Sequence, residues 1–409
     1  MRALWATRAG RAVVIALGAL ALVTAIGVVM LWPRGETFEA QELVAGEDLS
    51  ATVTAVIEGD CEEFAGPDCK RLAVELNSGA EAGRTTSITL PGDELQPEVE
   101  AGDEVRVLAL DPASGLGLDS DAAPPGGQGG ERTYIFVDFE RGSPLAALAV
   151  IFVVLVVLFG RRRGALALCG LAASLALVLL FVVPAIAEGG PPLGVALVGA
   201  SAVMFLTISL THGLGAQSAA AMLGTTFALL LTALLAALFI ELSAITGLVS
   251  EQATLLRGAS EGTLSLPGLV LAGVVIGALG VLDDVTVSQA STVMALRRAD
   301  PAQGVGQLYH AALTVGRDHV GATVNTLVLA YVGAALPVLL LFSTQDIGLG
   351  TAVQREAVAE EVVATLVGSI GLITAMPLTT ILAAALAVRL PVAALQHGHG
   401  HVHVHQTEH

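Results

Sequence analysis

The sequence predicts a polytopic α-helical membrane protein with about eight transmembrane helices and a small extracytoplasmic β domain. Hydrophobic residues make up 54% of the 409 residues and charged residues only 14%, unlike an ordinary soluble domain. Several apolar runs reach the roughly 20 residues that span a bilayer. One acidic, polar segment interrupts these runs. We therefore expect four parts, at residues 1–34, 35–142, 143–390 and 391–409.

The chain begins with a basic segment that runs into apolar residues. Arg2, Arg8 and Arg11 precede the apolar run 13–32, a pattern shared with secretory signal peptides. The run is longer than the roughly 7–15 residues of a cleavable core, and the bulky Trp32 closes it where small residues would be expected. We therefore predict an uncleaved first transmembrane helix with its basic end in the cytoplasm.

Residues 35–142 carry nearly all of the net charge. From Arg34 to Arg141 there are 24 Asp and Glu against 7 Lys and Arg, which accounts for −17 of the chain's −18. A nucleic-acid partner is excluded because the basic footprint that it requires is missing. Two interpretations remain for the acidic surface: a soluble, self-repelling exterior, or a surface that attracts cations.

The same segment alternates apolar and polar residues, as half-buried strands do. The predicted strands are 52–58, 71–77, 85–90, 104–110 and 133–139. Their inward-facing candidates, taken at every second position, are Val53, Ala55, Ile57, Leu72, Val74, Leu76, Val105 and Val107. Five short strands in about 100 residues predict an OB-like barrel or a β-sandwich.

Two cysteines lie close together in the polar segment. Cys61 and Cys69 flank the short stretch EEFAGPD. Outside the cytoplasm such a pair forms a structural disulfide, which we predict here. A metal site is the weaker alternative, since two thiols are too few ligands.

From Pro144 the chain is almost continuously apolar. We expect helices at 144–160, 165–187, 192–211, 215–241, 265–296, 319–343 and 359–389, which with the first helix makes eight spans. With the N-terminus inside, the cytoplasmic segments hold Arg2, Arg8, Arg11, Arg161, Arg162, Arg163, Arg297, Arg298, Arg317 and Arg389, and the short outer loops hold only Arg257 and Arg355. The positive-inside rule thus places both termini in the cytoplasm and the β domain outside.

Four strings in the apolar region are recognisable together. They are LTHG at 210–213, GALGVLDDVTVSQAS at 277–291, GRDHVGATVNTLVLAYVGAALP at 316–337 and GSIGLITAMPLTT at 368–380. Over about 144–390 the chain resembles the YibE/F-like family of multipass bacterial membrane proteins. The resemblance implies a bacterial cell-membrane location and a helical bundle, preceded in the longer members by an extracytoplasmic domain. It implies no substrate.

The strongest functional candidates are two adjacent carboxylates in an apolar helix. Asp283 and Asp284 follow a glycine-spaced run, and helical spacing aligns Gly273, Gly277, Gly280, Asp284, Ser288 and Ser291 on one stripe. Small residues allow helices to pack closely, and polar residues in a membrane face protein or water. A carboxylate pair could hold an ion or a proton. The alternative is that both aspartates are solvated at the membrane interface.

Three further residues join the candidate site. Asp318 and Asn325 share one face of the following helix. An amide within a membrane span requires a hydrogen-bonding partner, and it serves either an ion path or helix–helix association. His212 lies in the short turn THGLG, where a capping role is the alternative to a ligand role.

The C-terminal tail alternates histidine with glycine or valine. Its candidate metal ligands are His397, His399, His401, His403 and His405, which as a cluster would bind a divalent transition metal. No P-loop, nucleophile elbow or HExxH motif occurs, so we do not expect an enzyme.

Two functions fit these observations. The first is a secondary transporter or ion-translocating protein, with metal as one substrate class. The second is a non-catalytic scaffold whose β domain binds a partner at the cell envelope. The expected partners are the lipid bilayer and either a second copy of the chain or another family member.

Overall fold

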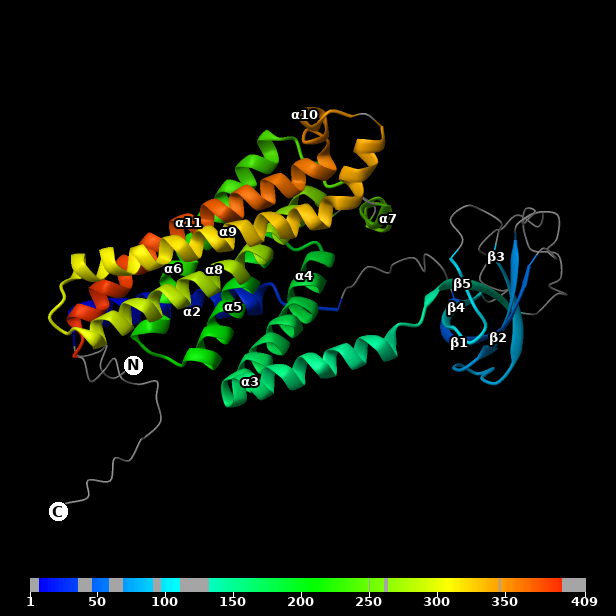
Figure 1. The fold of residues 1–409 in the computed structure, drawn as a ribbon, viewed down its shortest axis with the longest axis horizontal. Coiled ribbons are helices and arrows are strands. Elements are labelled where there is room, and N and C mark those ends of the chain that lie inside the picture. Colours follow the sequence, from blue (N-terminus) through cyan, green and yellow to red (C-terminus); the bar gives the residue numbers. More distant parts are fainter. Residues whose placement is uncertain are drawn as a thin grey trace, which may run out of the picture. The chain divides into compact units, whose positions relative to one another are not determined.

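The computed structural model describes residues 7–35, 46–58, 69–90, 97–110, 132–249, 251–260, 264–345 and 347–391. Cys61 and the five tail histidines lie outside these ranges, so the disulfide and the metal-binding tail stay predictions. The chain forms two compact units: a larger one from residues 1–39 and 159–409, and a smaller one from residues 40–158. Figure 1 shows the elements of each unit.

The smaller unit contains a five-stranded antiparallel sheet. Its strands are β1 (Gly46–Glu58), β2 (Lys70–Leu76), β3 (Thr85–Leu90), β4 (Glu104–Leu110) and β5 (Thr133–Phe139), in the order β3-β2-β1-β4-β5. The long central β1 pairs with β2 through its second half and with β4 through its first half. This arrangement curls the sheet until β3 and β5 approach each other. The inner face buries a core of its own, in which Leu72, Val74 and Val105 are fully buried.

A β-bulge in β1 makes the predicted core wrong for two residues. The register of β1 against β2 shifts between Val53 and Ala55. Because one extra residue reverses the side-chain alternation beyond it, Val56 packs against the core while Ala55 and Ile57 are exposed. The other inward candidates, on β2 and β4, are buried as predicted.

One buried tyrosine links the sheet to a turn. The Tyr134 hydroxyl donates a hydrogen bond of 2.5 Å to Glu81 Oε2. Burial, together with this bond, raises the pKa of Tyr134 to about 12. The same bond, aided by Arg84, holds the pKa of Glu81 below its usual range. The pair therefore favours a neutral phenol bound to an ionised carboxylate.

The other regular elements of the described residues are helices. They are α2 (Arg8–Met30), α3 (Gly142–Leu177), the π-helix η1 (Val178–Val182), α4 (Val183–Ala187), α5 (Pro192–His212), α6 (Ala216–Leu242), α7 (Glu251–Ala259), α8 (Leu266–Ala299), α9 (Val305–Thr344), α10 (Leu349–Ala352) and α11 (Glu356–Arg389). Among the described residues, six helices are long and apolar enough to cross a membrane, or seven if the bent α9 counts as one span.

The predicted helices 144–160 and 165–187 are not separated by a loop. They form one helical stretch of 46 residues from Gly142 to Ala187, interrupted where Arg161 leaves the helical conformation at φ 50° and ψ −130°. A run of arginines gives no turn signal of its own, because arginine is a good helix former. The stretch ends in η1, with Pro184 at the start of α4.

The predicted helix 319–343 also starts earlier than expected. α9 begins at Val305, where the Gly304 amide donates to Gln307 Oε1 at 2.9 Å. Its first turns are polar, so apolar runs alone could not reveal them. Towards its other end, α9 bends by 58° just before Pro337, which cannot donate a backbone hydrogen bond.

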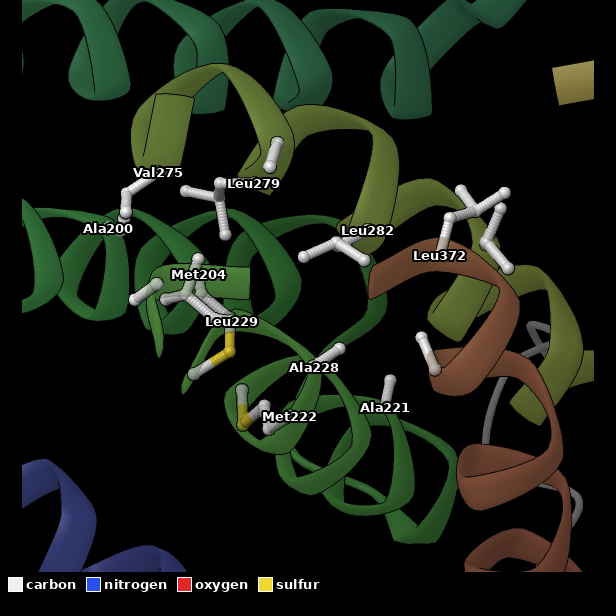
Figure 2. Close-up of a cluster of buried hydrophobic side chains, with 14 of the residues drawn as sticks. Ala200, Met204, Ala221, Met222, Ala228, Leu229, Val275, Leu279, Leu282 and Leu372 are labelled. Carbon is white, nitrogen blue, oxygen red and sulfur yellow. The ribbon is translucent and has the colours of Figure 1, made fainter. Parts of the chain in front are cut away.

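The core of the larger unit lies between α5, α6, α8 and α11, as Figure 2 shows. Small residues bring these helices close together. A Cβ atom added to Gly224 of α6 would clash with Thr379 of α11, and one added to Gly371 of α11 would clash with Thr232 of α6. Both glycines are therefore required for the α6–α11 contact.

The glycine run of α8 does not pack as predicted. Gly273, Gly277 and Gly280 are exposed, and the only atom within 4 Å of a Cβ built on any of them is the Tyr331 hydroxyl, near Gly277, among the parts of the chain that the structure describes. Helical spacing identified the stripe correctly, but spacing alone does not show which side of a helix faces its neighbours.

Candidate functional site

A cavity of about 980 Å³ lies within the larger unit, between α3, α5 and α8. The wall from α3 begins at Arg163 and continues into η1, and α5 contributes residues from Gly199 to His212. α8 contributes one side over Ile276 to Arg298, which is about 33 Å of helix at 1.5 Å per residue. The cavity is therefore elongated and follows the helices.

One face of α8 is buried in the bundle, and the other lines the cavity. Its packed face contains Leu282, Thr286, Gln289 and Val293, all buried against the rest of the bundle. Its open face contains Gly280, Asp284, Ser288 and Ser291, all of which line the cavity. Asp283 lies between the two faces, on the side of α5. Burial of the packed face thus fixes the direction of both carboxylates.

The Asp283 carboxylate is poorly satisfied. Its Oδ2 accepts one long hydrogen bond, 3.3 Å, from the Thr207 hydroxyl of α5. Its Oδ1 is buried and has no hydrogen-bond partner among the described residues. Burying an ionised carboxylate without partners is costly. A proton or a cation from the cavity would supply the missing interaction.

Asp284 is more open to the cavity than Asp283. Its side chain is 74% exposed, and its Oδ2 lies 4.0 Å from Nε2 of His319 on α9. The Ser288 hydroxyl donates to the Asp284 backbone carbonyl at 2.7 Å and leaves the carboxylate unoccupied.

The end of the cavity beyond the carboxylates is basic and polar. It is lined by Arg163, His212, Gln217 and Arg298. His212 is the last residue of α5, where its Nδ1 lies 2.7 Å from the Thr211 hydroxyl. Because the following Gly213 has φ 70°, the helix ends there and the imidazole stays at the cavity mouth.

Four of the six predicted site residues meet in this cavity: Asp283, Asp284, Ser288 and His212. Asp318 and Asn325 do not. Both are exposed on the outer face of α9 and neither lines the cavity. The two residues share one helical face, but α9 meets α8 through its opposite side, where Ala312 and Gly316 contact Gln289.

Most residues that line the cavity were not among the predicted candidates, and three of these carry hydrogen-bonding or charged groups that bear on the site. Thr207, Arg163 and Arg298 lie on helices distant from Asp283 in sequence or several turns away from it. The arginines were used only to orient the helices, and Thr207 lies three residues before the LTHG string. Only the packing of α5 against α8, with α3 across the cavity, brings them together.

Two polar residues beside the aspartates serve the core instead. The Thr286 and Thr225 hydroxyls are 2.6 Å apart between α8 and α6. Gln289 Nε2 donates to the Ala312 carbonyl and to the Thr380 hydroxyl, each at 2.9 Å. Gly316 makes room for this amide, since an added Cβ would lie 2.7 Å from Gln289 Oε1. These groups connect α8 to three helices.

The described residues contain no group of three or more His, Cys, Asp or Glu side chains arranged to hold a metal ion. Within the described part of the chain, the cavity is therefore no ready-made metal centre.

The fold and the site together define a class: a bundle of long apolar helices that encloses a carboxylate-bearing cavity. The family model for YibE/F-like protein matches residues 148–389, more than half of the chain, and the chain belongs to this family. The match includes the cavity, both aspartates and the outer face of α9. No curated protein and no solved structure matches the chain.

Proposed function

We propose that this protein is a secondary transporter or ion-translocating protein of the bacterial cell membrane. The observation that carries the proposal is the cavity of about 980 Å³ with Asp283 and Asp284 in its wall. Carboxylates placed inside an apolar bundle cost several kcal/mol and generally face a cavity that serves an ion or substrate path. A scaffold has no need for such a cavity.

The proposed membrane arrangement has eight spans with both termini in the cytoplasm. The 46 residues of Gly142–Ala187 are long enough for two crossings, with the break at Arg161 as the cytoplasmic turn. Arg8 at the start of α2 and Arg389 at the end of α11 line one common surface, which supports basic ends on one side. The β domain is then extracytoplasmic.

Cysteine labelling tests this arrangement in intact cells. With the native cysteines replaced, Ser120→Cys should react with a membrane-impermeant maleimide, and Asp300→Cys should react only after the membrane is permeabilised. The opposite labelling pattern would refute the topology.

The transport proposal is tested in vesicles reconstituted with the full chain. Asp283→Asn and Asp284→Asn should each abolish cation-driven flux because they remove the charge from the cavity while keeping its shape. Asp300→Asn is the matched control, since Asp300 is exposed beyond the end of α8 and only caps the Ala302 amide. Unchanged flux in both cavity variants would sink the proposal.

The scaffold remains the second candidate because the β domain has its own core and a strongly acidic composition. In-cell crosslinking of the full chain at exposed positions of the β domain tests it. Recovery of one defined envelope protein, together with normal growth of the two cavity variants, would favour the scaffold over transport.

Two local proposals complete this assignment. The Cys61–Cys69 disulfide should be found by non-reducing peptide mass spectrometry, and free thiols in the mature protein would rule it out.

The histidine tail should bind Ni²⁺ or Zn²⁺ in isolation; we propose it as an accessory metal site on the cytoplasmic side. Loss of metal accumulation after deletion of residues 396–409 tests its role in cells.

A further inference from the structure

We infer that the cavity accepts an amphipathic organic cation, with an apolar body and one ammonium-like or phosphonium-like group. This inference rests on the proposed transport function and names its substrate class. It follows from the size of the cavity, from the order of its lining residues and from the unsatisfied carboxylates.

The cavity is too large for a single inorganic ion. Binding sites for organic ligands range over roughly 300–1,000 Å³, and the volume of about 980 Å³ lies at the upper end. A desolvated metal ion needs several ligands within roughly 2–2.6 Å, and the described residues offer no such cluster. The space therefore fits an organic molecule.

The lining changes from apolar to acidic along the cavity. One end is formed by Val178, Val182, Ala200, Ile276 and Leu279. Asp283 follows Ile276 by seven residues on α8, which is about 10 Å of helix. A ligand with its charge about 10 Å from the far end of its apolar body would match both regions.

The carboxylates select the sign of the ligand charge. Among the described residues, Asp283 Oδ1 has no hydrogen-bond partner, and the Asp284 carboxylate has His319 at 4.0 Å as its one ionic partner. A bound cation would be attracted electrostatically to both carboxylates. Arg298 weakens this attraction only slightly, because it lies 15 residues from Asp283, about 22 Å along α8, and Coulomb interaction falls with distance.

The lining residues favour one charge over two. Arg163 lines the end through which a cytoplasmic ligand would enter. A charge spread over a large apolar ion is weakly hydrated and easily desolvated, whereas a divalent metal ion needs several replacement ligands that the described lining residues do not group together. A monovalent organic cation is therefore favoured over a divalent metal ion.

Two ions of equal shape and opposite charge test the inference. Tetraphenylphosphonium should bind the full chain in lipid nanodiscs, and tetraphenylborate should bind at least tenfold more weakly. Asp284→Asn should weaken tetraphenylphosphonium binding by about tenfold or more, which corresponds to about 1.4 kcal/mol. Gly280→Leu should abolish binding by filling the cavity, and the fold should tolerate it because an added Cβ there has no atom within 4 Å.

Each outcome decides the matter. Equal binding of both ions would overturn the inference, because the site would then be merely apolar. Aspartate-dependent flux of an inorganic cation without tetraphenylphosphonium binding would overturn the inference and leave the transport proposal intact. Absence of both flux and binding would remove both.

A second inference concerns the outer face of α9 and is independent of the cavity. We propose that this face, formed by Thr314, Asp318, Ala322, Asn325 and Leu329, pairs with the same face of a second copy of the chain. All five residues are exposed. Asn325 lies six residues beyond His319, about 9 Å further along α9 and inside its apolar portion.

The polar groups of this face are self-complementary. Within the described ranges, no side-chain hydrogen bond or ion pair involves Arg317, Asp318 or Asn325. An amide both donates and accepts, so two copies of Asn325 related by a two-fold axis satisfy each other. Arg317 and Asp318 are adjacent in sequence and do not face each other in one helix, but each can pair with the opposite charge of the second copy.

Subunit counting of the full chain in vesicles at low protein density tests this pairing. The unmodified chain should be dimeric, and Asn325→Leu should weaken association by about tenfold, as expected for roughly 1–2 kcal/mol from an interhelical amide bond. Thr326→Val is the matched control, because the Thr326 hydroxyl already donates to the Ala322 carbonyl of its own helix.

Disulfide formation by Ala322→Cys gives a second readout that does not depend on affinity. A monomer at every density, or a dimer that ignores Asn325→Leu and fails to crosslink through Ala322→Cys, would overturn the inference. Crosslinking to a different protein through Ala322→Cys would overturn it as well.

Discussion

Polar side chains on the packed face of α8 are hydrogen-bonded to other helices, whereas the carboxylates towards the cavity are poorly satisfied. On the packed face, Thr286 and Gln289 are buried and make hydrogen bonds of 2.6–2.9 Å with α6, α9 and α11. Towards the cavity, the nearest partners are 3.3 Å from Asp283 and 4.0 Å from Asp284. The hydrogen-bonded residues therefore stabilise the bundle, and the poorly satisfied ones are available to a ligand.

Glycines of the bundle also fall into two kinds: those in contact with a neighbouring helix and those beside open space. Gly224 and Gly371 allow α6 and α11 to touch, whereas Gly273 and Gly280 of α8 have no atom within 4 Å of an added Cβ. Glycine therefore allows close helix packing between α6 and α11, whereas on α8 it leaves open space beside the helix.

The largest expected effect comes from breaking the α6–α11 contact. Gly224→Leu should destabilise the folded protein by about 3 kcal/mol or more, because even a Cβ atom there clashes with Thr379. The loss would be measured as a fall in the thermal unfolding midpoint in detergent. Gly273→Leu is the control and should leave the midpoint unchanged; an equal fall in both variants would contradict the distinction between the two kinds of glycine.

Loss of the Gln289 amide should have the next largest effect. Gln289→Leu removes two interhelical hydrogen bonds and should cost about 1–2 kcal/mol in the same unfolding experiment. Ser288→Ala, one residue earlier but on the open face, removes a bond within its own helix only and should change stability by less than about 0.5 kcal/mol. A larger effect at Ser288 than at Gln289 would reverse the assignment of the two faces.

Removal of a cavity carboxylate should have a smaller effect, with the opposite sign. Asp283→Leu should raise stability by about 1 kcal/mol, because it eliminates a buried charge with one weak hydrogen bond. Cation-driven flux should be lost in the same variant. Destabilisation comparable to that of Gln289→Leu would show that Asp283 is a structural residue.

The smallest expected effect on stability is in the β domain. It tests whether the contrast between the two faces of α8 is confined to the helical bundle. The raised pKa of Tyr134, about 12, means that the folded β domain holds the phenol proton after the unfolded chain, near pH 10, has lost it. Stability from this group is full below about pH 10 and is lost as the pH rises towards 12. The protection factors of the sheet amides in the full chain, taken relative to the intrinsic base-catalysed exchange rate, should fall over this range.

The lowered pKa of Glu81 predicts a second loss at acidic pH. Its contribution is present above the usual pKa of 4.5 and disappears as the pH falls through the lower folded value. Tyr134→Phe should remove the alkaline loss and reduce the acidic one, while ligand binding by the bundle stays unchanged. A change in cavity binding in this variant would contradict the independence of the two units.

Much of the fold and part of the site could be predicted from local patterns. Apolar runs and strand alternation located the long helices and the five strands, and the adjacent aspartates identified the centre of the site. The bulge after Val53 was missed because no glycine or proline marks it. The predicted break between residues 160 and 165 is present, but as a kink at Arg161 in place of a loop.

The sequence by itself determined which residues share a face of each helix, since the 3.6-residue period depends only on the backbone. It also determined family membership and the placement of two carboxylates in an apolar run. Only the tertiary structure decided which face of α8 and α9 meets a neighbour. That choice depends on how several helices pack at once: Gly224, Gly316 and Gly371 admit close contacts that turn Thr286 and Gln289 inward and leave Asp284 facing the cavity.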